Sequence, residues 1–203
     1  MKRMITLTGA LLAVLGFYGP WVTTQRQVAA LTYNALDLTE FCKFILRAGL
    51  GQVTRELFLV PIVAAALALA LWASQPEQRS RILRYALAAV AVVLSLVPLP
   101  PYPHVLTAYA SAEDRGSFWL SLVGLLGVAL IILFGQRITS RWRDATFGAL
   151  ALIGAICPIW EFATRALPAV SRAYASPAVV GWGLVVTVAG FVLVAAGAVI
   201  RGN

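Results

Sequence analysis

The chain has 203 residues, of which 61% are hydrophobic and only 12% are charged, and its mean hydropathy is +0.86. An ordinary soluble domain is about 45–50% apolar and about 25% charged, so this composition excludes a typical soluble globular protein. It also excludes a disordered tail, which lacks apolar residues, and a disulfide-rich secreted scaffold, because two cysteines form at most one bridge. We therefore expect an all-α, polytopic integral membrane protein.

Six long apolar runs approach the length that a transmembrane helix needs, which is about 20 residues for about 30 Å of hydrocarbon. The runs are rich in Ala, Leu and Gly and apolar on every face, whereas barrel strands alternate with a period of two. The expected spans cover residues 4–22, 57–73, 82–99, 118–135, 147–162 and 179–200. They form three helical hairpins within one membrane domain, 1–203.

The positions of Lys and Arg predict the orientation, because short cytoplasmic loops retain positive charge. With the N-terminus inside, the inner segments carry a net charge of +7 and the outer segments +1, which together account for the total of +8. We therefore expect a protein of the cell membrane with both termini in the cytoplasm. Topology explains the basic pI, so the expected partners are the lipid bilayer and other membrane subunits, and not nucleic acid.

The first span has a second interpretation. Lys2 and Arg3, the apolar stretch that ends at Phe17, and the small residues Ala29 and Ala30 also fit a signal peptide with its cleavage site. Cleavage there would leave five spans, with the new N-terminus outside.

Between the first two spans, residues 35–48 have the pattern of an amphipathic helix. Asn34 is a suitable N-cap, Asp37 stands at the third helical position of a capping box, and Gly49 suits the far end. Apolar residues recur at helical spacing on one stripe: Leu38, Phe41, Ile45 and Ala48. This helix is expected to lie flat in the outer interface or to cover the bundle as a lid.

Each outward-going span is expected to end at a proline with aromatic neighbours, in segments 17–21, 97–103 and 157–162. Proline ends or bends a helix, and Trp and Tyr favour the membrane interface. The three ends could form a shared outer vestibule, although such residues are common wherever a span ends.

An outward-facing cavity under the 35–48 helix is the candidate ligand or partner site. Acidic residues at the edge of apolar spans and interfacial aromatic residues are the groups that we expect to line it. These residues are Asp37, Glu40, Trp21, Tyr33, Tyr102, Trp160 and Glu161. Glu161 also has Arg165 four residues later, at the spacing of a helical ion pair.

Catalytic and cofactor signatures are missing from the sequence. It contains no GxSxG, HExxH, CxxC or GxxxxGK[ST] motif, and its single histidine, His104, provides no paired-histidine site. We expect no cofactor and no bound metal. Cys42 and Cys157 are expected as separate thiols, with one outer disulfide as the alternative.

Small residues in the sixth span favour close helix packing, within the bundle or against a partner subunit. The glycines of this face are Gly181, Gly183, Gly190 and Gly197. Together these features predict a non-enzymatic accessory or scaffold subunit of a larger membrane complex. The alternative is a small solute-binding or transport subunit, and a weaker one is a lipid-modifying enzyme with Asp37 or Glu40 as the base.

Overall fold

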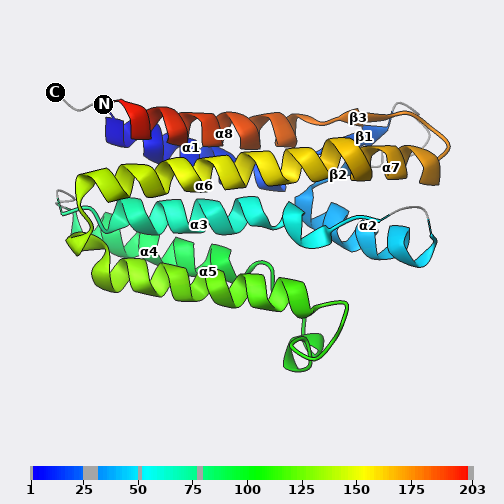
Figure 1. Ribbon diagram of the computed structural model, residues 1–203, viewed down its shortest axis with the longest axis horizontal. Helices are drawn as coiled ribbons and strands as arrows, with labels where there is room; N and C mark the ends of the chain where they lie inside the picture. Colours follow the sequence, from blue (N-terminus) through cyan, green and yellow to red (C-terminus); the bar gives the residue numbers. More distant parts are fainter. Residues whose placement is uncertain (1, 25–31, 50–51, 77–79, 201–203) are drawn as a thin grey trace.

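The computed structural model describes residues 2–24, 32–49, 52–76 and 80–200, which form a mostly helical bundle with a small β-sheet at one end (Figure 1). The α-helices are α1 (Lys2–Tyr18), α2 (Ala35–Arg47), α3 (Val60–Ala73), α4 (Arg81–Leu96), α5 (Arg115–Phe134), α6 (Ser140–Glu161), α7 (Leu167–Ala173) and α8 (Trp182–Val199). The strands are β1 (Val22–Thr24), β2 (Thr32–Tyr33) and β3 (Ala178–Val180). Short helical turns are η1 (Arg55–Phe58), η2 (His104–Leu106), η3 (Gly135–Arg137) and the π-helical turn η4 (Phe162–Ala166).

Helix α3 lies at the centre of the bundle and contacts α1, α4, α5 and α6. Nearly all of its side chains are buried, and the buried residues lie on every face of the helix, among them Ala64, Ala68, Leu69 and Leu71. A helix that is apolar all round is stable only when apolar surroundings cover every face. In α3, neighbouring helices provide most of that cover.

Helices α1 and α8 form the most extensive helix pair, and glycines allow their backbones to approach closely. A Cβ added to Gly9 would lie 2.6 Å from the Gly190 carbonyl oxygen, and one added to Gly16 would lie 2.6 Å from the Gly183 oxygen. The two glycines of each helix are seven residues apart, so the same faces meet along the contact. Close backbone contact supplies the dispersion energy that lipid-embedded helices need for association.

A three-stranded antiparallel sheet with strand order β2-β1-β3 joins the chain after α1 to the chain before α8. Val22 pairs with Tyr33 on one side and with Val180 on the other. The sequence pattern does not predict this sheet, because strands of two or three residues carry no readable alternation. The expectation of an all-α fold is therefore right for most of the described chain and wrong at this sheet.

Among the described residues, three helical segments are long and apolar enough to cross a membrane: Arg115–Arg137, Ser140–Ala173 and Trp182–Val199, of 23, 34 and 18 residues. The helices in the first, second and third expected spans are shorter than predicted. The first ends at Tyr18, ahead of the strand β1 that begins at Val22, and the second begins at Val60, after the turn η1. The possible cleavage site at residues 28–30 lies outside the described residues.

Proline ends α1 and α4 as expected, but the expectation is wrong for α6. The chain stays helical beyond Pro158, through Glu161 and η4 to the end of α7. Pro158 removes one donor, but Phe162 still donates its backbone N–H to the Pro158 carbonyl, so the helix resumes one turn later. A π-helical turn then follows, a common accommodation inside a long helix.

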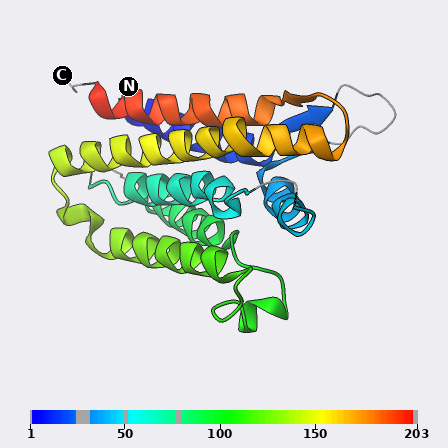
Figure 2. The ribbon, with the colours of Figure 1, turned by 45° about the vertical axis from the view of Figure 1, so that its right-hand side comes forward.

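Two ends of the bundle differ in structure (Figures 1 and 2). We call the end that carries α2, the sheet and η1 the cap. The opposite end, where α1 begins and α8 finishes, is called the terminal end. In Figure 2, α2 lies across the cap end of the bundle, and the connection between α4 and α5 projects beside it.

Candidate functional site

Helix α2 begins with the predicted capping box. Asp37 donates its backbone N–H to Asn34 Oδ1 at 2.9 Å, and Asn34 donates its own to Asp37 Oδ2 at 3.2 Å. Gly49 adopts a positive φ of 66° just past the helix end. The helix predicted for residues 35–48 is thus confirmed to within one residue, with Asn34 as its N-cap and Asp37 as the third residue of the capping box.

One face of α2 packs onto the bundle, as the lid interpretation expects. Its buried residues are Ala35, Leu38, Thr39, Cys42 and Ile45. Ala48, expected on this stripe, is exposed, and Cys42 lies in the buried face instead. Both cysteines are free thiols. Burial, and then the negative charge of Glu161, raise the pKa of the Cys42 thiol to about 12, so it stays protonated.

Aromatic side chains form a buried cluster at the cap. Trp21 is fully buried and meets Phe58 and Phe162 edge to face, with ring centroids 6.2 and 6.3 Å apart. Its indole Nε1 donates to the Gly16 carbonyl at 3.0 Å. Trp21 is therefore a core residue of the cap.

A second aromatic cluster joins α2 to the sheet and to α7. Phe41 lies 5.1 Å from Tyr33 and 5.7 Å from Tyr174, centroid to centroid. The Tyr33 and Tyr174 hydroxyls are hydrogen-bonded to each other. Desolvation, and then this hydrogen bond, raise the pKa of Tyr33, which keeps the phenol neutral.

Glu161 is the most deeply buried acidic residue of the described chain, with only 1% of its surface exposed. Its carboxylate accepts a hydrogen bond from the Thr54 backbone N–H and lies 3.5 Å from the Arg165 guanidinium. The predicted ion pair at i,i+4 is confirmed. The contact with Thr54 also ties α6 to the start of η1, so Glu161 has a clear structural role.

Five charged side chains form an ionic network that we call the latch: Lys43, Arg47, Arg55, Glu113 and Asp114. Arg47 donates to both carboxylate oxygens of Glu113, at 2.9 and 3.1 Å. Asp114 lies 3.4 Å from Lys43 and 3.3 Å from Arg55. The latch joins α2 and η1 to the segment that leads into α5.

A cavity of about 470 Å³ opens beside the latch, and we call it the cap cavity. Its lining combines cationic, acidic and apolar side chains: Lys43, Leu46, Arg47, Val53, Thr54, Arg55, Glu56, Ala112 and Glu113. Arg55 is 6% exposed, and its Nε finds no hydrogen-bond partner among the described residues. A cavity of this size with a few convergent polar groups is typical of a small-molecule site.

The cap cavity uses none of the seven residues that the sequence pattern singled out. Trp160 is 64% exposed on α6, and Tyr102 is 80% exposed in the connection after α4. Glu40 is exposed and pairs with Lys43 at 2.9 Å. Asp37 lines a separate cavity of about 100 Å³ at the first turn of α2.

The sequence analysis did not single out the residues of the latch. Their charges do point to a contact, because the adjacent acids Glu113 and Asp114 lie in one expected outer segment, and a second outer segment carries three basic residues: Lys43, Arg47 and Arg55.

The expected glycine face of the sixth span packs within the chain. Gly183 and Gly190 contact α1, and Gly181 lies against the backbone of Pro20. Gly197 is buried in α8. These positions therefore serve contacts inside the bundle.

Within the described ranges, no group of three or more His, Cys, Asp or Glu side chains could hold a metal ion. No family model, no curated protein and no solved structure matches this chain. Its function is therefore inferred from the chemistry of its own residues.

Proposed function

We propose that the protein crosses the cell membrane six times, with α1, α3, α4, α5, α6 and α8 as its spans. Three long apolar segments support this proposal, and α1 and α3 are shorter apolar helices packed beside them. The distribution of basic residues supports a cytoplasmic location for the terminal end, and both termini with it. The cap then faces outward.

Labelling with a membrane-impermeant maleimide tests this topology in intact cells. In a chain without Cys42 and Cys157, Tyr102→Cys is expected to react from outside, because this residue is exposed on the cap side. Arg141→Cys, at the start of α6, is expected to react only after permeabilisation. The reverse pattern would contradict the orientation, and reaction of both sites would contradict the six-span arrangement.

For the biochemical role, we propose non-enzymatic binding of a small solute in the cap cavity. The cavity itself is the observation that carries this proposal: its volume is about 470 Å³, and the second half of α2 and the buried Arg55 are part of its lining. Arginine favours carboxylate or phosphate groups, and Leu46, Val53 and Ala112 suit an apolar portion. An amphiphilic solute with one acidic group fits this lining.

Native mass spectrometry of gently extracted protein tests the proposal, because it detects a bound ligand of unknown identity by its mass. We expect a small-molecule adduct that Leu46→Trp removes, because the larger ring fills the cavity. Phe44→Trp is the matched control, since Phe44 lies on the same helix but outside the cavity lining. An adduct that survives Leu46→Trp, or no adduct at all, would count against solute binding.

An accessory subunit of a larger membrane complex is the second candidate, and the exposed face of α5 favours it. Only 22% of the apolar stretch within Arg115–Arg137 is buried inside the chain. Large apolar side chains form a continuous exposed stripe at helical spacing: Trp119, Val123, Leu126, Leu130 and Leu133. Stoichiometric partner proteins in the same mass spectra would support this role, whereas a monomer would contradict it.

A further inference from the structure

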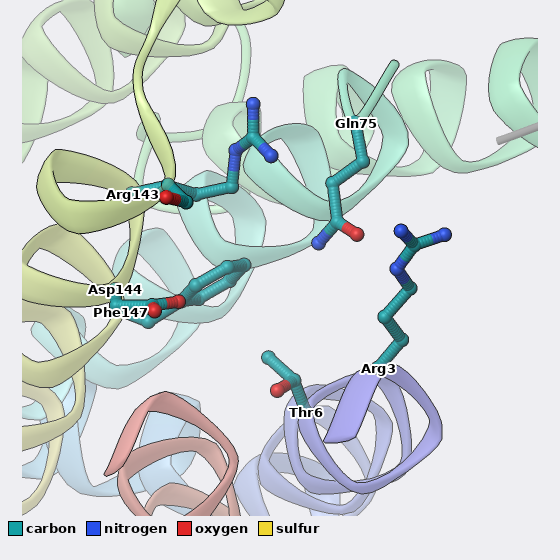
Figure 3. Close-up of a pocket in the computed structure, with 7 residues that line it drawn as sticks. Arg3, Thr6, Gln75, Arg143, Asp144 and Phe147 are labelled. Carbon is teal, nitrogen blue, oxygen red and sulfur yellow. The ribbon is translucent and has the colours of Figure 1, made fainter. Parts of the chain in front are cut away.

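A second cavity, of about 140 Å³, lies at the terminal end, and we call it the terminal cavity (Figure 3). Helices α1 and α6 and the chain just after α3 supply its walls. The lining residues are Arg3, Thr6, Gln75, Ser140, Arg143, Asp144 and Phe147. In Figure 3 the side chain of Arg143 extends from α6 toward Gln75, and Arg3 stands on the opposite side of Gln75. This space is far from the cap cavity and shares no lining residue with it.

Arg143 is an unusual wall residue because it is charged and only 8% exposed. Its Nη2 donates to the backbone carbonyls of Ile138, at 3.0 Å, and Gly135, at 3.4 Å. Its Nε is buried without a hydrogen-bond partner among the described residues. These two hydrogen bonds fix the guanidinium, and with it the positive charge, beside the cavity.

The first turn of α6 adds positive potential to the same place. Ser140 opens this 22-residue helix and lines the cavity, and the N-cap Thr139 makes no side-chain capping hydrogen bond. A helix N-terminus directs backbone N–H groups and the positive end of its dipole at a bound anion. The terminal cavity therefore combines two guanidinium groups, a helix N-terminus and the polar side chains of Gln75, Ser140 and Thr6.

One acidic group, Asp144, also lines the terminal cavity and opposes an anion there. Two arginines against one carboxylate leave a formal charge of +1, before the contribution of the helix N-terminus. The volume has room for several water molecules or for one tetrahedral oxyanion. A cation in this space would be repelled by the two arginines.

We propose that the terminal cavity binds a phosphate group. Arginine forks match the spacing of phosphate oxygens, and Gln75 and Ser140 can donate further hydrogen bonds. In the proposed topology this end lies at the cytoplasmic surface, where basic pockets between helices bind lipid headgroups. The phosphate belongs either to an anionic lipid or to a soluble phosphate compound, and the chemistry on the cavity side is the same.

Two binding measurements on the purified full-length chain separate these sources. In the first, inorganic phosphate is titrated into protein in neutral detergent, at constant ionic strength set with chloride, and thermal unfolding is followed. In the second, the protein is placed in phosphatidylcholine nanodiscs with or without phosphatidylglycerol, and native mass spectrometry counts the retained anionic lipid. Saturable stabilisation by inorganic phosphate indicates a soluble compound, whereas retention of phosphatidylglycerol alone indicates a headgroup.

Variants locate the site. Arg143→Lys keeps the charge but removes the planar guanidinium, and Arg3→Gln removes the second one. Each single variant is expected to weaken phosphate binding by at least about tenfold, which corresponds to the loss of one charged hydrogen bond. Asp144→Asn is expected to tighten binding, an effect that damaged folding cannot imitate. Arg141→Gln is the matched control, because it removes one exposed charge from the same turn of α6 but does not line the cavity.

Phosphate-independent stability together with no retained anionic lipid would overturn the proposal. Equal losses in Arg141→Gln and in the Arg3 and Arg143 variants would also overturn it, because they would indicate general charge attraction. None of these substitutions touches the cap cavity, so failure here and failure of solute binding are distinguishable.

Discussion

At the cap, Trp21 contacts Phe58 and Phe162 edge to face, and the latch adds ion pairs at the surface. At the terminal end, the first turns of α1 and α6 leave a polar cavity beside a buried arginine. Both ends thus contain a cavity with charged walls, but only the cap also has a closely packed aromatic cluster beside its cavity. Close aromatic packing stabilises one fixed arrangement, so we expect substitutions in the aromatic cluster to cost more stability than substitutions at the terminal cavity.

The largest effect that tests this comparison is expected from Trp21→Ala. The substitution removes a fully buried indole and its hydrogen bond to Gly16, so we expect a loss of about 3–5 kcal/mol in the free energy of unfolding. Phe147→Ala is the counterpart at the terminal end. Its ring borders the terminal cavity, where it has no packed neighbour on that side, so its cost should be near the low end of this range.

Denaturant unfolding in mild detergent, followed by circular dichroism, measures both variants. Equal losses would show that the two ends are packed equally well and would contradict the comparison.

Glu161→Gln is expected to have the next largest effect, about 1–3 kcal/mol of destabilisation, because the buried carboxylate accepts from Thr54 and pairs with Arg165. Glu40→Gln, a change at an acidic residue with an exposed side chain, serves as the control and should cost less than about 0.5 kcal/mol. The same unfolding measurement applies. A Glu161→Gln variant as stable as Glu40→Gln would mean that the negative charge of Glu161 contributes nothing to the stability of the cap.

The sequence predicted local features of the cap better than its contacts. Asn34 and Asp37 specify the start of α2 within four residues, and Glu161 and Arg165 specify an ion pair within one helical turn. Interactions over such short separations depend on the helix alone, so their pattern is readable. The latch joins residues about 60–70 positions apart, and no local pattern encodes which charges meet.

Two failures of prediction have a physical cause in tertiary context. Interfacial preference places Trp21 in a cavity wall, but edge-to-face neighbours from η1 and η4 bury it completely. The sequence predicts that the fifth span ends in segment 157–162, but the chain stays helical to Ala173; one turn before Pro158, Gly154 lies tightly against the Phe191 ring of α8. Neither neighbour is close in sequence.

The raised pKa of the Cys42 thiol makes the free energy of unfolding depend on pH through this one residue of the cap. The thiol has a pKa of about 12 in the folded chain and an ordinary value of 9.0, so between these values the folded state binds more protons. Its contribution is fully present below pH 9 and is lost as the pH rises toward 12. Between about pH 8 and 10, the wild type should therefore lose about 1 kcal/mol in its free energy of unfolding relative to Cys42→Ala.

Ile45→Val, one turn further along the same buried face, is the control for the Cys42 measurement. Its stability should parallel that of the wild type across this pH range, because no titrating group is changed. A constant difference between wild type and Cys42→Ala would show that the thiol ionises as readily in the folded chain as in the unfolded one.

Removing an ion pair of the latch is expected to have the smallest effect on stability. Glu113→Gln removes the exposed ion pair with Arg47 but leaves the hydrogen bond from Arg55 to the Glu113 backbone carbonyl, at 2.7 Å. We expect a coupling energy of about 0.2–1 kcal/mol in a double-mutant cycle with Arg47→Gln, and less at high salt. A coupling as large as the Trp21→Ala loss would reverse the order of contributions, because surface charge and not aromatic packing would then hold α2 on the bundle.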